Sequence, residues 1–253
     1  IEVTVKGTLF EDVPAYYGVF RDRNMAVIEM AAAAGLPLIG ERKNPLIATT
    51  YGVGQLIADA VKRGFKKIII GLGGSCTNDG GAGMAAALGV KFLKKDGTEF
   101  IPTGGTLKQI DKIDMSGMME GIKDVEITAM CDVDVPLHGP NGAAYIFAKQ
   151  KGATDNQIAE LDEQLRYLDK VIERDMNKSV ASIPGAGAAG GLGAGVMAFL
   201  DGRLEKGIEI MLDAVGFENH IKDADIVITG EGKLDTQSLR GKVVIGVARR
   251  VKP

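Results

Sequence analysis

The sequence predicts an α/β protein with a mixed sheet. Short apolar runs that fit strands alternate with amphipathic stretches that fit helices, an order typical of this class. A turn-prone Asp-Arg-Asn at residues 22–24 separates two of these runs and indicates a hairpin, so part of the sheet should be antiparallel. A glycine-rich loop at residues 71–83 directly follows a strand-like run, as in proteins that bind ligands at the carboxyl ends of their strands.

The chain begins with strand-like sequence. Runs at residues 1–5, 15–20 and 25–30 fit strands, and the last two flank the predicted hairpin turn. Apolar residues with helical spacing then predict a helix over residues 55–63, and Gly64 supplies its stop.

The middle of the chain continues the alternation. Residues 67–70 form an apolar run that predicts a buried strand, and a helix is expected to start near residues 84–88. Asp96-Gly97 predicts the turn of a second hairpin within residues 90–101. Residues 125–130 fit another strand.

A long amphipathic helix should begin after Thr154. The sequence Thr154-Asp155-Asn156-Gln157 has the form of a capping box, in which two side chains satisfy free amides at a helix start. The apolar residues that follow at three- and four-residue spacing predict packing against a core. They are Ile158, Leu161, Leu165, Leu168, Ile172 and Met176.

The C-terminal part contains further helices and one more strand-like run. A second glycine cluster at residues 185–195 precedes predicted helices near 196–200 and 206–215. Residues 224–229 form an apolar run that predicts a strand, and residues 243–250 predict a last helix. Both chain ends look cut, since the first residue is not Met and the last follows a helical stretch, so we expect a longer protein lacking its N- and C-terminal parts here.

Composition excludes several classes of partner. The 253 residues carry a net charge of −3 without a run of Lys or Arg, which argues against nucleic acid and anionic membranes. No apolar run approaches the roughly 18 residues of a membrane span. Two cysteines, Cys76 and Cys131, cannot form a disulfide framework and favour a reducing cytoplasm. His138 and His220 lie far apart, which argues against zinc.

The loop at residues 71–83 is the strongest functional signal. It holds six glycines, whose small size lets backbone amides approach a ligand closely. A helix that starts there would add free amides and the positive end of its dipole, which suit a phosphate or carboxylate. The candidate binding residues of this loop are Gly73, Gly74, Ser75, Thr77 and Asn78, and Asp79 adds a carboxylate.

A second glycine motif is weaker. Residues 185–190 match G-x-G-x-x-G, a pattern of dinucleotide-binding proteins. That motif needs a strand before it, whereas the end of the long helix and Pro184 precede it here. Tight helix packing or the edge of a cleft is therefore the better interpretation.

Acidic residues follow three of the predicted strands. They are Asp79 after residues 67–70, Asp132 and Asp134 after residues 125–130, and Glu231 and Asp235 after residues 224–229. If these strands share one sheet, their loops converge on one cleft. Lys233, Arg240 and Lys242 would add positive charge, a mixture that suits phosphoryl transfer with Mg²⁺.

These motifs together resemble the bacterial glycerate kinases of the glycerate 2-kinase type. The resemblance rests on residues 71–83, 131–144, 147–153, 184–193 and 229–235, in this order along essentially the whole chain. It implies an ATP-dependent kinase that phosphorylates D-glycerate, most often to 2-phosphoglycerate, with ATP and Mg²⁺ as cofactors. Small-molecule substrates are then the expected partners, and a homo-oligomer is left open.

The resemblance also implies a domain organisation. Residues 1–222 should form a mixed-sheet α/β domain inserted into a Rossmann-like α/β domain, and residues 223–253 should be a partial return into the latter. On that template one wall of the cleft is missing, so the chain alone is expected to be inactive.

Particular residues are expected to carry the reaction. Asp79, Asp132 and Asp235 are the predicted catalytic carboxylates, acting as base or with Mg²⁺. Glu231, Lys233 and Arg240 are predicted to bind substrate or phosphate along with the glycine loop. The sequence leaves the division of these roles open, and it identifies no metal ligand.

Two other functions stay open at this point. The motif at residues 185–190 keeps an NAD-dependent oxidoreductase as an alternative. A non-catalytic domain that holds a small hydroxy acid without ATP is the other alternative.

Overall fold

The computed structural model describes residues 1–232 and 243–251, so the predicted site residues Lys233, Asp235 and Arg240 lie outside the described residues. A five-stranded sheet has the order β10-β9-β5-β4-β3. Strands β4, β5 and β9 run parallel, and β3 pairs antiparallel with β4, which confirms the predicted mixed sheet. These strands are β3 (Gly18–Phe20), β4 (Met25–Glu29), β5 (Lys67–Gly71), β9 (Glu126–Met130) and β10 (Arg203–Glu205).

Two smaller antiparallel sheets complete the described strands. One pairs β1 with β2, and the other has the order β7-β6-β8, with the predicted hairpin turn at Asp96-Gly97 between β6 and β7. Their strands are β1 (Glu2–Lys6), β2 (Asp12–Tyr16), β6 (Lys91–Leu93), β7 (Glu99–Phe100) and β8 (Lys112–Asp114).

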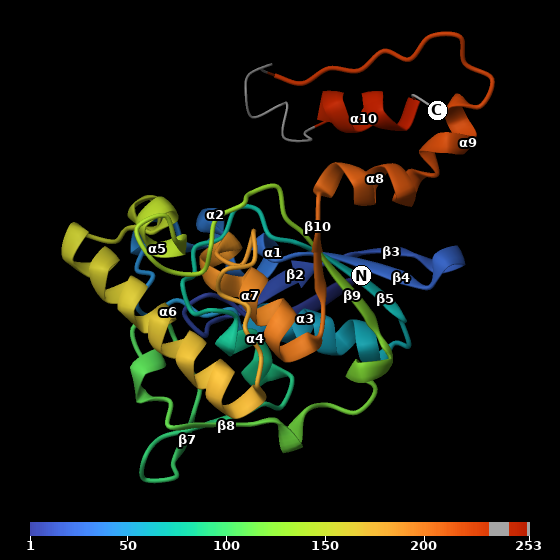
Figure 1. Cartoon of the computed structure of the whole chain (residues 1–253). Helices are drawn as coiled ribbons and strands as arrows, with labels where there is room; N and C mark the ends of the chain where they lie inside the picture. Colours follow the sequence, from blue (N-terminus) through green and yellow to red (C-terminus); the bar gives the residue numbers. More distant parts are fainter. Residues whose placement is uncertain (233–242, 252–253) are drawn as a thin grey trace. The chain divides into compact units, whose positions relative to one another are not determined.

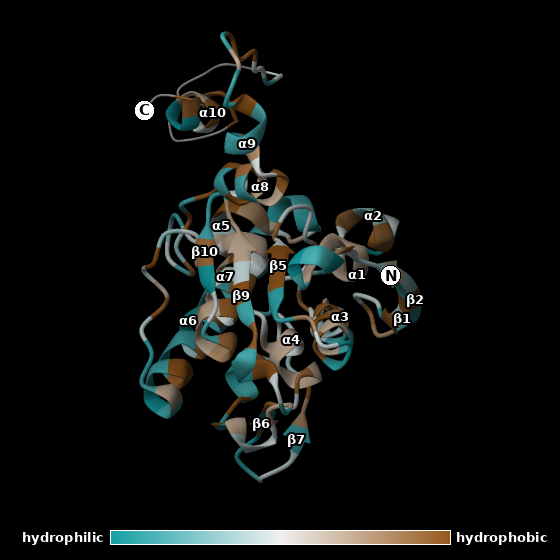
Figure 2. Ribbon diagram, turned by 90° about the vertical axis from the view of Figure 1, so that its right-hand side faces the viewer, coloured by the Kyte–Doolittle hydropathy of each residue, from teal (hydrophilic) through white to brown (hydrophobic). Residues whose placement is uncertain are grey.

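Helices connect most of the strands, and the longest begins where the sequence predicts it. Thr154 and Gln157 form the complete capping box at the start of α6. Figure 1 shows α6 beside α7 at the edge of the molecule, and Figure 2 shows alternating hydrophobic and hydrophilic bands along it. The helices are α1 (Ala31–Ala34), α2 (Leu36–Ile39), α3 (Tyr51–Lys62), α4 (Ala82–Ala87), α5 (Ala143–Phe147), α6 (Asp155–Met176), α7 (Ala188–Leu200), α8 (Gly207–Val215), α9 (Phe217–Ile221) and α10 (Val243–Val251).

The core surrounds the parallel strands. Ile68, Ile69 and Ile70 of β5 are all buried, because a central parallel strand is covered on both faces. The apolar stripe predicted for α6 is also buried, apart from the partly buried Met176 at its end. Because β4, β5 and β9 are parallel, they end at the same edge of the sheet, and the loops after β5 and β9 line the candidate site there.

The chain divides into two compact units, Ile1–Leu204 and Glu205–Pro253. This boundary falls earlier than the predicted domain boundary at residues 222/223, and the insertion into a Rossmann-like domain stays a prediction. The strand predicted over residues 224–229 is wrong, because these residues adopt no strand. Ile226 is 79% exposed and Ile228 is 91% exposed, so no strand among the described residues pairs with this segment and covers its side chains.

Two further observations concern the helices and the cysteines. Among the described residues, no helix is both long enough and apolar enough to cross a membrane. Cys76 and Cys131 are free thiols.

Candidate active site

A cavity of about 250 Å³ lies beyond the carboxyl ends of β5 and β9. The loop after β5 contributes Gly73, Gly74 and Ser75, and the loop after β9 contributes Asp132. Because parallel strands end at the same edge of a sheet, these loops meet as the sequence predicts. The same two loops also contribute Leu72, Cys131 and Val133, and the end of β9 contributes Met130. The other lining residues come from α2, α5, the turn after α5 and the start of α7, and they are Leu36, Phe147, Gln150, Ala188 and Ala189.

The first part of the glycine loop is fixed from one side. Leu36 donates its backbone amide to the Gly74 carbonyl at 2.9 Å, and Gly35 and Ser75 form an isolated bridge. Gly74 has a φ of +73°, a left-handed conformation that disfavours other residues. Gly73 and Gly74 therefore form a tight backbone turn against the cavity.

The second part of the loop is held by Asp79, which is fully buried. Its Oδ2 accepts hydrogen bonds from the Thr50 amide at 2.7 Å and the Thr50 hydroxyl at 2.8 Å. The same carboxylate accepts from the Gly81 and Gly83 amides at 3.3 Å each. Burial raises the pKa of Asp79, and these hydrogen bonds oppose the rise.

This arrangement changes the expected role of the helix start. The first amides of α4 should have been free for a substrate anion, but those of Gly81 and Gly83 bind Asp79, and that of Met84 binds the Thr50 hydroxyl at 2.9 Å. The anion at this helix start is thus a side chain of the protein itself. Only the earlier part of the loop, at residues 73–75, faces the cavity.

The second glycine cluster packs directly against the first. Ala189, Gly190 and Gly191 have left-handed φ values of 54°, 68° and 91°, which kink α7 near its start. A Cβ on Gly190 would lie 2.0 Å from the Thr77 carbonyl oxygen. The Gly80 amide donates to the Gly190 carbonyl at 3.0 Å, so the two backbones are in contact. This confirms the interpretation of tight packing.

The structure of the residues before this motif argues against dinucleotide binding there. Residues 177–187, all described, form turns and extended segments rather than a strand. The motif at residues 185–190 therefore lacks the strand–turn–helix context that a dinucleotide site needs.

A buried lysine, Lys151, binds the glycine loop at Thr77. Lys151 is 1% exposed and its Nζ donates to the Thr77 carbonyl at 2.7 Å. Burial lowers the pKa of Lys151 to about 8, with the charges of Cys76 and Asp79 acting in the opposite direction. The Lys151 ammonium therefore fixes the Thr77 carbonyl of the glycine loop.

Comparisons with known proteins identify the family of this chain. A family profile described as "Glycerate kinase family" matches residues 1–253. The chain belongs to the glycerate kinase family. It is 53% identical to the glycerate kinase of Halalkalibacterium halodurans, over 99% of this chain and 66% of the relative. It is 49% identical to the glycerate 2-kinase of Escherichia coli, over 98% of this chain and 65% of the relative.

A solved structure agrees with this membership. A crystal structure from Salmonella typhimurium LT2, provisionally called glycerate kinase 2, superposes with a TM-score of 0.93 at 44% identity. It matches 100% of this chain, which covers 68% of that structure. The chain thus spans about two thirds of the length of the relatives it matches.

The predicted site residues divide into three groups. Gly73, Gly74, Ser75 and Asp132 line the cavity together. Thr77, Asn78 and Asp79 are fully buried and are absent from the lining, while Glu231 belongs to the second unit. The roles of Lys233, Asp235 and Arg240 stay predictions, since these residues lie outside the described part of the chain.

Some residues of this candidate site were not predicted. Phe147 and Gln150 line the cavity, and Lys151 lies behind it. They belong to a segment, residues 147–153, that the family resemblance includes, but no spacing or motif marks their roles. Thr77 Oγ1 and both amide atoms of Asn78 are buried without a hydrogen-bond partner in the described structure.

One carboxylate of the cavity, that of Asp132, fits a ligand of Mg²⁺. Within the described residues, no cluster of three or more His, Cys, Asp or Glu could hold a metal ion. Mg²⁺ commonly uses one or two carboxylates together with nucleotide phosphates, and Asp132 in the cavity lining meets that need. Asp132 therefore fits one ligand of a Mg²⁺ ion that also binds nucleotide phosphates.

Proposed function

We propose that this protein is an ATP-dependent kinase that phosphorylates D-glycerate to 2-phosphoglycerate. The observation that carries the proposal is the convergence of the glycine loop and Asp132 on one cavity in a member of the glycerate kinase family. The names of its relatives, glycerate kinase and glycerate 2-kinase, support the substrate and the position.

The cavity offers groups for both parts of the substrate. Backbone amides in the loop at Gly73–Ser75 and the Ser75 hydroxyl would bind the glycerate carboxylate or the ATP phosphates. Asp132, which is exposed, would accept the proton of the glycerate hydroxyl. The hydroxyl oxygen then bonds to the γ-phosphorus as the bond to the bridging oxygen breaks, which releases ADP. Mg²⁺ held by Asp132 and the phosphates would neutralise phosphate charge.

The remaining predicted residues keep their proposed parts. Lys233 and Arg240 would balance phosphate charge, and Glu231 and Asp235 would assist the base or the metal. For Asp79, the geometry supports a positioning role, because both carboxylate oxygens already bind backbone or hydroxyl donors. Two free thiols also support a reducing, cytoplasmic location.

An assay of ADP release with D-glycerate and ATP tests the proposal. The 253-residue chain and a full-length relative are assayed side by side, and the product is analysed as 2- or 3-phosphoglycerate. ADP release from the chain would overturn the expectation that it is inactive alone. Glycerate binding by the full-length protein without ADP release would support the non-catalytic alternative.

Asp132→Asn tests the proposed base. In whichever of the two assayed proteins releases ADP, we expect kcat to fall about 100-fold or more, the size typical of a lost general base. Stability should be unchanged, because Asp132 is exposed. Asp134→Asn is the matched control, since Asp134 is exposed on the same loop but does not line the cavity. Equal activity of the two variants would contradict the role of Asp132.

A further inference from the structure

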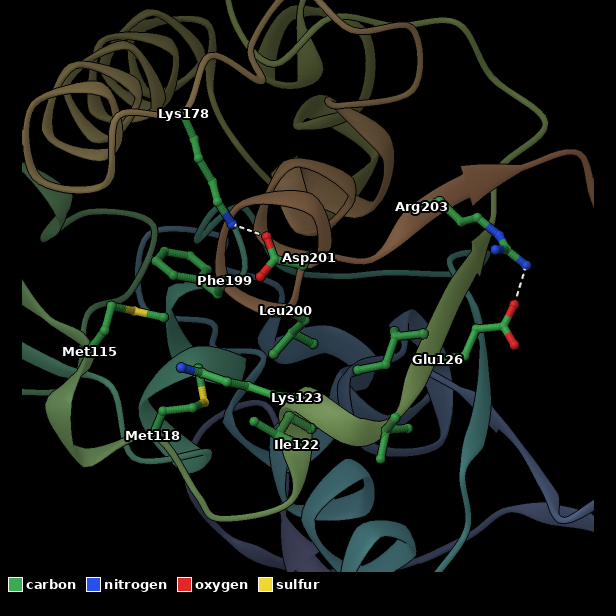
Figure 3. A pocket seen from close by; sticks show the side chains of 12 residues that line it. Met115, Met118, Ile122, Lys123, Glu126, Lys178, Phe199, Leu200, Asp201 and Arg203 are labelled. Carbon is green, nitrogen blue, oxygen red and sulfur yellow. Dashed lines mark hydrogen bonds and ion pairs between the residues drawn. The ribbon is translucent and has the colours of Figure 1, made fainter.

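A second cavity, of about 430 Å³, lies in the first unit and shares no lining residue with the candidate site. Figure 3 shows its side chains, which come from residues 115–127, Lys178 and residues 199–203. Its wall is mixed: five of its twelve lining residues are charged, and the apolar part includes Met115, Met118, Ile122, Phe199 and Leu200. The volume falls within the range of about 300–1,000 Å³ typical of small-molecule sites.

Charged groups surround this apolar part, and most of them are already paired. Lys178 donates to the Asp201 carboxylate and the Ala198 carbonyl at 2.5 Å each, and to the Met197 carbonyl at 3.4 Å. These three acceptors match the three protons of its ammonium group. Arg203 pairs with Glu126 across the other end of the cavity, as Figure 3 shows.

Lys123 differs from these two cations. No group in the described part of the chain forms a hydrogen bond or ion pair with it, and its side chain extends along the apolar wall in Figure 3. The lining carries three cations and two carboxylates, so its net charge is positive. An apolar wall beside one unpaired cation matches a ligand with an apolar body and one negative charge.

We propose that this cavity binds a small monoanion with an apolar body, of the class of medium-chain or aromatic carboxylates. Lys123 would bind the anionic group, and the methionines would adapt to the apolar body. The proposal does not depend on the kinase function, because it uses none of the residues assigned to that function.

The second cavity and the candidate site are built partly from the same two elements, β9 and α7. Strand β9 has Glu126 and Ile127 in the second cavity and Met130 in the candidate site. Helix α7 has Phe199 and Leu200 in the second cavity and Ala188 and Ala189 in the candidate site. The two cavities therefore lie at opposite ends of the same two elements, and their ligands should bind without competing.

Two fluorescent probes of similar shape test the proposal. Anilinonaphthalene sulfonate has an aromatic body and one negative charge, and N-phenylnaphthylamine lacks the charge. We expect the anionic probe to bind with increased fluorescence and octanoate to displace it, while ATP and D-glycerate do not. Lys123→Met keeps the apolar stem and should weaken the anionic probe about tenfold, the size of one charge-assisted contact, with the neutral probe unaffected.

Lys170→Met is the matched control, because Lys170 is an exposed lysine of α6 outside the cavity. Equal affinity of K123M and K170M for the anionic probe would overturn the proposal. So would displacement of the probe by ATP or D-glycerate, which would place it in the candidate site. An equal loss for both probes with a lower urea midpoint would assign Lys123 a structural role and would also overturn it.

Discussion

At the scale of single residues, the buried charged side chains of Asp79 and Lys151 fix the position of the glycine loop at residues 71–83. Asp79 is fully buried and accepts four hydrogen bonds, and Lys151 is almost fully buried and donates to the loop at Thr77. A buried charge is costly unless its hydrogen bonds are satisfied, so both residues bind their partners in one arrangement. These contacts hold the glycine loop in one conformation.

Asp79→Asn should destabilise the protein, because an amide nitrogen cannot accept the hydrogen bonds now made to one carboxylate oxygen. We expect the free energy of unfolding in urea to fall by about 2–3 kcal/mol, the size of lost hydrogen bonds to a charged group. Asp134→Asn, on an exposed loop, should leave it unchanged. Normal stability of Asp79→Asn together with a large loss of kcat would instead favour the predicted catalytic role.

Lys151 should make stability depend on pH. Its pKa of about 8 in the folded protein lies below the ordinary value of 10.5. Between these values the unfolded chain binds more protons, so the free energy of unfolding should rise as the pH increases through this range. Each pKa difference of one corresponds to about 1.4 kcal/mol, which gives a rise of about 2–3 kcal/mol between about pH 7 and pH 10.

Lys151→Met removes this titration. The free energy of unfolding of the original protein rises with pH by some amount, and that of the variant by another. The difference between the two rises is the contribution of Lys151, because the other groups that titrate in this range are present in both proteins. Urea unfolding at several pH values measures both. Parallel pH profiles of the two proteins would show that Lys151 titrates normally.

At the scale of elements, the two glycine clusters act as one unit. The left-handed turn at residues 189–191 brings α7 into backbone contact with the loop after β5. Only glycine allows this approach at residue 190, since a Cβ there would overlap the Thr77 carbonyl oxygen. The position of the candidate cavity between α7 and this loop depends on that contact.

Gly190→Ala should therefore displace the loop and reduce the proposed kinase activity as well as stability. Gly97→Ala is the control, because Gly97 also has a positive φ of 82° but has open space at the Cβ position. Backbone strain of about 1 kcal/mol is common to both variants, so only the overlap separates them. We expect the urea midpoint of Gly190→Ala to be clearly the lower of the two, and equal midpoints would contradict the packing argument.

At the scale of the whole molecule, the large hydrophobic core belongs to one unit. Its buried residues extend from Val5 to Leu200, all within the unit Ile1–Leu204. Within the described residues of the second unit, Arg250 binds Glu209, Asp213 and Glu218 at 2.8, 2.7 and 2.5 Å. In this second unit the ion pairs add to a small set of buried apolar side chains, which are Ile210, Leu212, Ala214 and Val247.

A chain of residues 1–204 should fold on its own, because it keeps the whole of this core. We expect a single cooperative transition in urea, with a midpoint close to that of the 253-residue chain, measured by far-ultraviolet circular dichroism. A broad transition, or a large fall in the midpoint, would show that the core depends on residues 205–253.

The sequence by itself determined the α/β class, the glycine loop and most of the longer elements, such as β4, β5, β9, α3 and α6. It did not predict β8, β10, α1, α2, α5 or α9, which span three to five residues each. Periodicity and capping are local properties, which explains why the capping box at Thr154 and the strand at Ile68–Ile70 are confirmed. The strand predicted at residues 224–229 is wrong because a strand needs a partner, and its apolar residues face solvent here.

Only the tertiary structure decided which polar groups of the loop face the cavity. Ser75 and Asp79 lie on the same loop, yet Ser75 lines the cavity while Asp79 binds Thr50 in the interior. Lys151 joins the loop from 74 residues away in the chain. No local pattern contains such contacts, because burial and hydrogen bonding depend on which distant segments pack together.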